Sequence, residues 1–162
     1  MIRCDAVTYL LGALVLLVLP LKWILSALTA ALIHEFCHIF ALWLLKERIH
    51  ILQVSFRGCT IDTSNMADWK QACSIVAGPL GSLSLLFLRR KLPLIAVCGL
   101  FHGLYNLLPM LPLDGGRLLR LVLSRICPQY ADRLLFISGI LCRLLLCLFA
   151  LHFLFLQKTF PL

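Results

Sequence analysis

Long apolar runs dominate this chain and limit its possible folds more than any other feature. A helix needs roughly 20 apolar residues to cross the hydrocarbon core of a bilayer. Five runs approach or reach that length between charged residues or prolines, and they cover residues 6–21, 23–45, 71–88, 92–113 and 134–156. The chain is 62% hydrophobic and 14% charged, whereas soluble domains average roughly 45–50% apolar and about 25% charged residues. We therefore predict an all-α polytopic membrane protein with about five (four to six) transmembrane helices, surrounded by a lipid bilayer.

Nothing in the sequence divides the chain into separate domains. We find no linker, repeat or low-complexity stretch, so residues 1–162 are expected to form one integral-membrane domain. The first run is short and follows Arg3, which would also fit a signal peptide. Asp5 near its start and the second run just after it favour a retained pair of helices instead.

The segment after the second run has a different character. Residues 48–62 are rich in β-branched and aromatic residues, and Arg57-Gly58 offers a turn. This pattern predicts a short β-hairpin, with an ordinary polar loop as the alternative.

The excess of basic residues has a membrane explanation. The net charge is +8, but the Lys and Arg residues punctuate the apolar runs and do not gather into a basic face. No nucleic-acid partner is expected. The eight cysteines contain no CxxC pair, which argues against both a zinc knuckle and a disulfide framework.

Two of the seven acidic residues stand out by their position. Glu35 lies about midway along the second run, and Asp114 directly follows the fourth. An ionisable group at bilayer depth costs roughly 2.5–3.5 kcal/mol on insertion scales, so it indicates a functional site.

Glu35 belongs to the sequence HEFCH, residues 34–38. On an α-helix, His34 and His38 are separated by about 40° around the axis and about 6 Å along it, so both imidazoles can bind one metal ion. Glu35 lies about 100° from His34, beside such an ion and not on it. This is the H-E-x-x-H pattern of zinc hydrolases, in which the glutamate is the general base.

Asp114 is the best candidate for a third ligand, because catalytic zinc usually has three protein ligands and a water. The remaining five acids sit at the edges of runs or in the polar loop, where water solvates them. The charges of Zn²⁺, one aspartate and one glutamate also sum to zero. Either carboxylate alone would leave a net buried charge.

Downstream residues carry a family resemblance. The stretch NLLPMLPLDGG, residues 106–116, has the pattern NxxPxxPxDG, with Asn106, Pro109, Pro112, Asp114 and Gly115 at its defined positions. Together with HEFCH and the intervening AGPLGS, it resembles the site-2 protease family of intramembrane zinc metalloproteases. The compact sporulation-type subgroup is the most similar. The resemblance covers roughly residues 25–120, which would form the catalytic core.

The resemblance implies a function and a set of site residues. His34, His38 and Asp114 would hold Zn²⁺, Glu35 would be the general base, and Asn106 would contact the substrate backbone. The activity would be hydrolysis of a membrane-embedded or membrane-proximal segment of a protein, possibly a pro-transcription factor in sporulation. The location would be a bacterial cell membrane.

Regulation is expected to come from outside the domain, because residues 1–162 show no PDZ or CBS domain. A regulatory membrane partner is therefore possible. The alternative function is that of a non-hydrolytic metal-binding membrane protein, such as a transporter or sensor, which could use the same ligands.

Three further features carry structural expectations. Ala77 and Gly81, and likewise Gly78 and Ser82, are four residues apart, which predicts a strip of small residues for close helix packing. Cys37 is interpreted as a packing residue. His102 is interpreted as a packing histidine, with a role near the metal or the substrate as the alternative.

Overall fold

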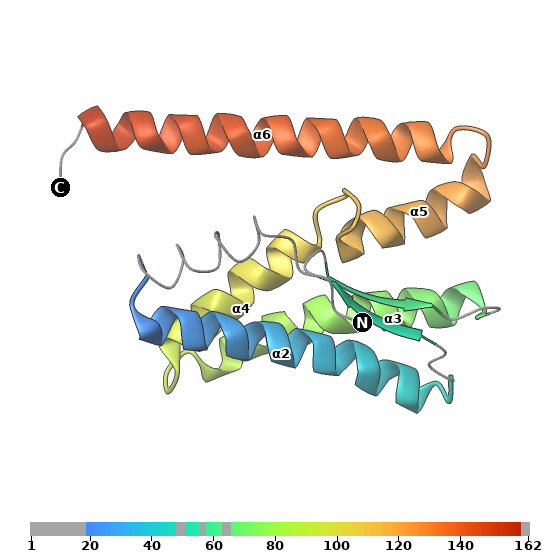
Figure 1. Cartoon of the computed structure of the whole chain (residues 1–162), viewed down its shortest axis with the longest axis horizontal. Coiled ribbons are helices and arrows are strands. Elements are labelled where there is room, and N and C mark those ends of the chain that lie inside the picture. The colour runs from blue at the N-terminus through green and yellow to red at the C-terminus, as the bar shows by residue number, and fades with distance from the viewer. Residues whose placement is uncertain (1–18, 48–50, 56–57, 63–65, 160–162) are drawn as a thin grey trace. The chain divides into compact units, whose positions relative to one another are not determined.

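A computed structural model describes residues 19–47, 51–55, 58–62 and 66–159. The chain divides into two compact units, Met1–Leu107 and Leu108–Leu162. Its elements in order are α2 (Leu21–Leu44), β1 (Ile51–Ser55), β2 (Gly58–Asp62), α3 (Asp68–Ser84), the 3₁₀ helix η1 (Leu85–Leu88), α4 (Pro93–Asn106), α5 (Asp114–Ile126) and α6 (Ala131–Thr159) (Figure 1).

Helices α2, α3 and α4 pack on one another in the first unit (Figure 1). Their shared core is apolar and is formed by small and branched side chains from all three helices and η1. Its members are Ala30, Leu42, Ile75, Leu85 and Ala96. The small residues let the helices approach closely, as expected for helices in a membrane.

Proline and a left-handed residue mark the ends of α2. Pro20 precedes the helix, and its carbonyl accepts from the amide of Trp23 at 2.9 Å. After the last turn, Lys46 has a φ of 53°, and the Glu47 amide donates to the Leu42 carbonyl at 3.1 Å. This backbone reversal satisfies carbonyls that a helix end otherwise leaves without partners.

The start of α3 is tied to the end of α2 by Lys70. Its ammonium lies 2.5 Å from a carboxylate oxygen of Glu47 and 3.4 Å from the carbonyl oxygen of Leu45. The two helices are thereby joined at one end by charge and along their length by packing.

Strands β1 and β2 pair antiparallel, with Ile51 opposite Asp62 and Ser55 opposite Gly58. The turn expected at Arg57-Gly58 includes residues 56 and 57, which lie outside the described residues. A complete hairpin therefore stays a prediction.

The expectation of one apolar span over residues 92–113 was wrong. Helix α4 ends at Asn106, and no helix is found from there until α5 begins at Asp114. Pro109 and Pro112 give the physical reason, since each lacks an amide donor and pushes the preceding residue out of helical geometry. Counting apolar residues gives no warning of this break.

The second unit contains α5 and α6, which pack on each other. The Ser138 hydroxyl of α6 donates to the Pro109 carbonyl at 2.7 Å, which holds the proline segment against the helix. A Cβ at Gly116 would overlap the backbone of Met110, so the first turn of α5 needs a glycine there.

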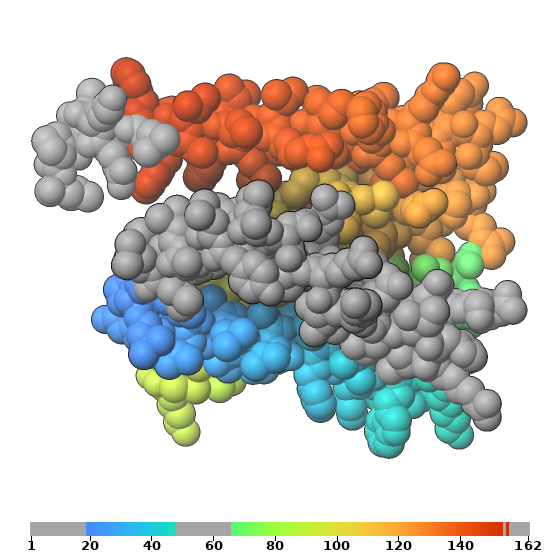
Figure 2. Space-filling model, viewed as in Figure 1, coloured from blue at the N-terminus to red at the C-terminus, as the bar shows by residue number. Residues whose placement is uncertain are grey.

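Three helical stretches in the described part of the chain are long and apolar enough to cross a membrane: Leu21–Leu44, Asp68–Leu88 and Ala131–Phe153. They correspond to the second, third and fifth predicted runs, and the helical class is confirmed for them. In Figure 2 the side chains of α6, orange to red, stand at the surface along the helix, and only 11% of its most apolar window is buried. Most of the predicted run 6–21 lies outside the described residues, so the total number of spans stays a prediction.

Candidate metal centre

His34 and His38 face the interior of the first unit from one side of α2. Their exposed fractions are 2% and 7%, and their Nε2 atoms lie 3.1 Å apart. The pair therefore meets at one point, as the four-residue spacing predicts.

Helix α3 holds the other nitrogen of each ring. His34 Nδ1 lies 2.9 Å from the hydroxyl of Ser82, which is fully buried. His38 Nδ1 lies 2.7 Å from the carbonyl oxygen of Ser74. A carbonyl can only accept, so His38 Nδ1 carries the proton, and in the neutral ring Nε2 presents its lone pair toward His34.

Both contacts match the way proteins orient metal-binding histidines, by an outer hydrogen bond to the nitrogen that does not bind the ion. Nitrogens that each lie about 2.0–2.1 Å from one tetrahedral zinc ion are about 3.3 Å apart. The observed 3.1 Å separation of the two Nε2 atoms is close to this value. The two histidines therefore fit zinc.

Glycines allow α3 to approach the histidine side of α2. A Cβ at Gly78 would overlap the imidazole of His38, and one at Gly81 would overlap the thiol of Cys37. Gly78, Gly81 and Ser82 are all buried, which confirms the predicted role of the small residues. Cys37 is a packing residue, as predicted.

Glu35 follows His34 on α2, and its side chain is half-buried. The next position around the helix places it beside the histidine pair and not between the two rings. A carboxylate there is suited to exchange protons next to an ion that the histidines hold.

Helix α4 brings a third imidazole to the pair. The ring of His102 meets that of His34 edge-to-face, with centroids 4.7 Å apart and an interplanar angle of 84°. One turn further on, the side-chain amide of Asn106 donates to the His102 carbonyl at 3.1 Å. His102 therefore packs on a predicted metal ligand, and this contact fits both the packing interpretation and the alternative of a role near the metal.

Asp114 is the first residue of α5 in the second unit, and it is 6% exposed. Arg117, one turn later, has its guanidinium 3.9 Å from the Asp114 carboxylate. The position at a helix N-terminus also favours a negative charge. Its membership of the metal centre stays a prediction.

Ser74 was not among the predicted site residues. It lies four residues before Gly78 and eight before Ser82, so the three small residues form one stripe along α3. This stripe could have predicted which face of α3 packs against α2. The particular contact was not predictable, because it uses a backbone carbonyl, which every residue has.

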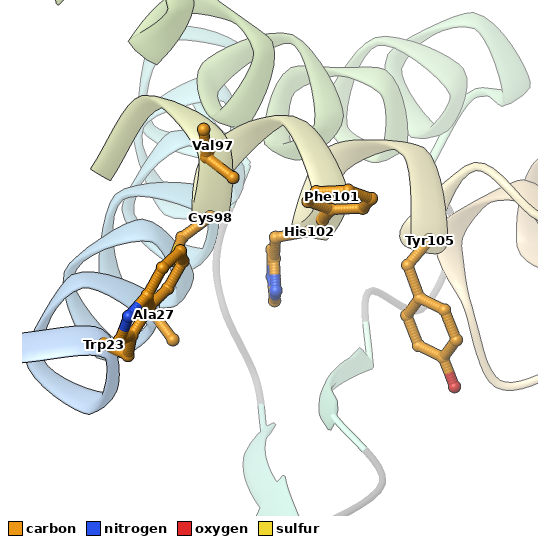
Figure 3. A pocket seen from close by; sticks show the side chains of 7 residues that line it. All are labelled: Trp23, Ala27, Val97, Cys98, Phe101, His102 and Tyr105. Atoms are coloured by element: carbon orange, nitrogen blue, oxygen red, sulfur yellow. The ribbon is translucent and has the colours of Figure 1, made fainter. Parts of the chain in front are cut away.

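A cavity of about 370 Å³ opens beside the histidines, between the first turns of α2 and the outer face of α4. Its lining residues are Trp23, Ala27, Val97, Cys98, Phe101, His102 and Tyr105 (Figure 3). In Figure 3 His102 and Tyr105 project from α4 toward the same side, and Trp23 stands across from them on α2. His102 therefore belongs both to the cavity wall and to the surroundings of His34.

Comparison with known proteins matches this chain to a family model and to a curated bacterial protein. Residues 49–146 match the model of peptidase family M50. The chain is also 33% identical over 142 residues to stage IV sporulation protein FB of Bacillus subtilis (strain 168), a match that covers 78% of this chain and 49% of that protein. The chain thus spans about half the length of this curated relative.

The family match is independent of the HEFCH motif. It includes Asn106 and Asp114 but begins after His38, so the histidine pair and the match are separate observations. The matched residues make up more than half of the chain, and the chain belongs to peptidase family M50, the site-2 protease family.

Proposed function

We propose that this protein is an intramembrane zinc endopeptidase that hydrolyses a peptide bond in a membrane-embedded or membrane-proximal segment of a protein substrate. The observation that carries the proposal is the buried histidine pair, with Nε2 atoms 3.1 Å apart and outer nitrogens held by α3. The chain's membership of a peptidase family rests on residues 49–146 and suggests that a metal ion held by this pair would serve peptide hydrolysis.

We propose that His34, His38 and Asp114 hold the zinc ion. A carboxylate would complete the three protein ligands that catalytic zinc usually has. The burial of Asp114 is consistent with this role, because a carboxylate held away from water keeps its charge only beside cationic or hydrogen-bonding partners, and zinc would add to its contact with Arg117. Zinc, when bound, polarises a carbonyl and lowers the pKa of water to about 7.

Glu35 is proposed as the general base. Its carboxylate takes a proton from the attacking water, whose oxygen bonds to the carbonyl carbon of the scissile peptide. The carbon–nitrogen bond then breaks, and Glu35 passes the proton to the leaving amine. One carboxyl and one amine end result, and Glu35 returns to its starting state.

Asn106 and the strands are proposed to hold the substrate. A carboxamide can donate to and accept from a peptide backbone, and Asn106 lies one turn after His102, which touches His34. A substrate helix must unwind before cleavage. Strand β1 or β2 would then offer an edge on which the unwound segment can pair.

The biological setting is proposed from the relative. The relative is named as a sporulation protein and comes from a bacterium, so we propose a bacterial cell membrane as the location. A regulatory protein such as a pro-transcription factor is the proposed substrate, and a membrane partner is the proposed regulator.

Co-expression with membrane-tethered candidate substrates tests the proposal. The wild-type chain is expected to release a shortened fragment that is absent with Glu35→Gln, at equal levels of both proteins in the membrane. Equal release by both chains would exclude Glu35 as the base. Zinc bound by a wild-type chain that cleaves none of the candidates would favour the non-hydrolytic alternative.

A further inference from the structure

The cavity between α2 and α4 lies directly beside the candidate metal centre. Ala27 is seven residues before His34, which is two helical turns, so both side chains lie on nearly the same face of α2. His102 on α4 links the cavity to His34, because its ring lines the cavity and also contacts the ring of His34. One side chain therefore separates the cavity from a metal ligand.

The walls of the cavity are mainly apolar. Trp23, Val97 and Phe101 supply hydrocarbon and aromatic surface, while the polar groups are confined to the tips of a few side chains. The volume, about 370 Å³, is near the lower end of the roughly 300–1,000 Å³ found for ligand pockets. Such a space suits one or two large uncharged side chains better than a charged group.

Ala27 determines the depth of the cavity on the α2 side. It is the smallest of the lining side chains, and a larger residue there would fill the space between Trp23 and His102. A single substitution at Ala27 can therefore fill the cavity.

We propose that this cavity is a substrate pocket that receives a bulky apolar side chain, such as that of leucine or phenylalanine, next to the scissile peptide bond. The proposal rests on the proposed function and adds a specificity-determining site to it. Asn106 would hold the peptide backbone one turn further along α4, and the pocket would select the neighbouring side chain.

The contact between His102 and His34 favours a substrate side chain over a lipid chain as the occupant of the cavity. A lipid chain would need only an apolar groove anywhere on the surface of the helices. This cavity is lined by His102, whose ring contacts the proposed metal ligand His34, so it lies one side chain away from the place where the peptide would be cleaved. A substrate side chain is therefore the occupant that the position favours.

A series of small peptide hydroxamates tests the proposal, because a hydroxamate binds zinc and presents its side chain beside the ion. Methyl, isobutyl and benzyl side chains would be compared by thermal stabilisation of the detergent-solubilised, zinc-loaded full chain. The wild type is expected to bind the isobutyl or benzyl compound at least about tenfold more tightly than the methyl compound.

Ala27→Trp is expected to reduce this preference to within about threefold, because the added indole fills the pocket that distinguishes the larger side chains from the methyl group. Leu28→Trp is the matched control. It adds the same side chain one residue later on an exposed part of α2 and should keep the wild-type preference. Val97→Trp, which fills the pocket from α4, provides a second variant if Ala27→Trp does not fold.

The outcomes separate the pocket from the function on which it rests. If the wild type binds the methyl compound but shows no preference for larger groups, or if both pocket-filling variants keep the preference, the pocket assignment is overturned. A lipid or another segment of the chain would then occupy the cavity. If no hydroxamate binds, the metal centre itself is wrong, and the pocket proposal falls with it.

Discussion

The hydrogen bond between His34 Nδ1 and the Ser82 hydroxyl joins two buried side chains from different helices. Loss of an outer hydrogen-bond partner typically lowers metal affinity about 10- to 100-fold. We expect Ser82→Ala to weaken zinc binding by this amount, as measured by competition with a chromophoric chelator. Ser84→Ala, which removes an exposed hydroxyl from the same helix, should leave the affinity unchanged. Equal effects of the two substitutions would show that the Ser82 contact does not orient His34.

Asp114→Asn tests the third proposed ligand. The amide keeps the size of the side chain and suits the start of α5, but it removes the negative charge. Zinc affinity is expected to fall by more than the roughly 10- to 100-fold that loss of an outer partner causes. The same competition measurement applies, and unchanged affinity would remove Asp114 from the ligand set.

At the scale of single residues, the sequence predicted the two histidines whose rings the structure brings together. His34, Glu35 and His38 stand out because polar groups are costly in an apolar run. Ser74 did not stand out, because its contribution is a backbone carbonyl. The contact of His102 with His34 joins α2 and α4, and no spacing within one helix predicts which side chains meet across two.

At the scale of elements, the approach of α3 to α2 depends on Gly78. A methyl group there would overlap the His38 ring, and overpacking of this kind typically costs about 1–3 kcal/mol. We expect Gly78→Ala to lower both the thermal stability in detergent and the zinc affinity.

Gly139→Ala is the control for Gly78→Ala. Gly139 is also a buried helical glycine, but its added methyl would come no closer than 3.3 Å to the mobile end of Arg143. Because alanine favours the helix by up to about 1 kcal/mol over glycine, the control should be neutral or stabilising. A similar loss in both variants would mean that helix geometry, and not the contact with His38, causes the effect.

The elements themselves were predictable only in part. Apolar length identified α2, α3 and α6, because hydrocarbon thickness sets a minimum for each. Apolar length predicted that the helix of α4 would continue to residue 113, because the residues after Asn106 are equally apolar. The prolines end the helix at Asn106. Helix α5 was not predicted, because its three arginines resembled the basic residues that flank membrane spans.

At the scale of the whole molecule, the proposed fold requires integration into a membrane. Three helical stretches are long and apolar enough to cross one, and many of their large side chains are exposed to the surroundings. We expect the protein to stay in the membrane pellet after extraction with alkaline carbonate and to be released by detergent. Recovery in the carbonate supernatant would contradict a membrane-spanning fold.

The single integral-membrane domain remains a prediction, because the structure divides the chain into two compact units. The proposed ligand set takes His34 and His38 from the first unit and Asp114 from the second. Zinc should therefore raise the thermal stability of the wild type by mass action, and much less that of Asp114→Asn.

The central claim is that Glu35 performs proton transfer beside a zinc ion that it does not bind. The most direct test measures zinc content and proteolysis together in purified wild-type and Glu35→Gln protein, each reconstituted with a substrate that the wild type cleaves. The proposed role of Glu35 predicts one zinc ion per chain in both proteins and product only from the wild type. Product formation by zinc-loaded Glu35→Gln at the wild-type rate would contradict it.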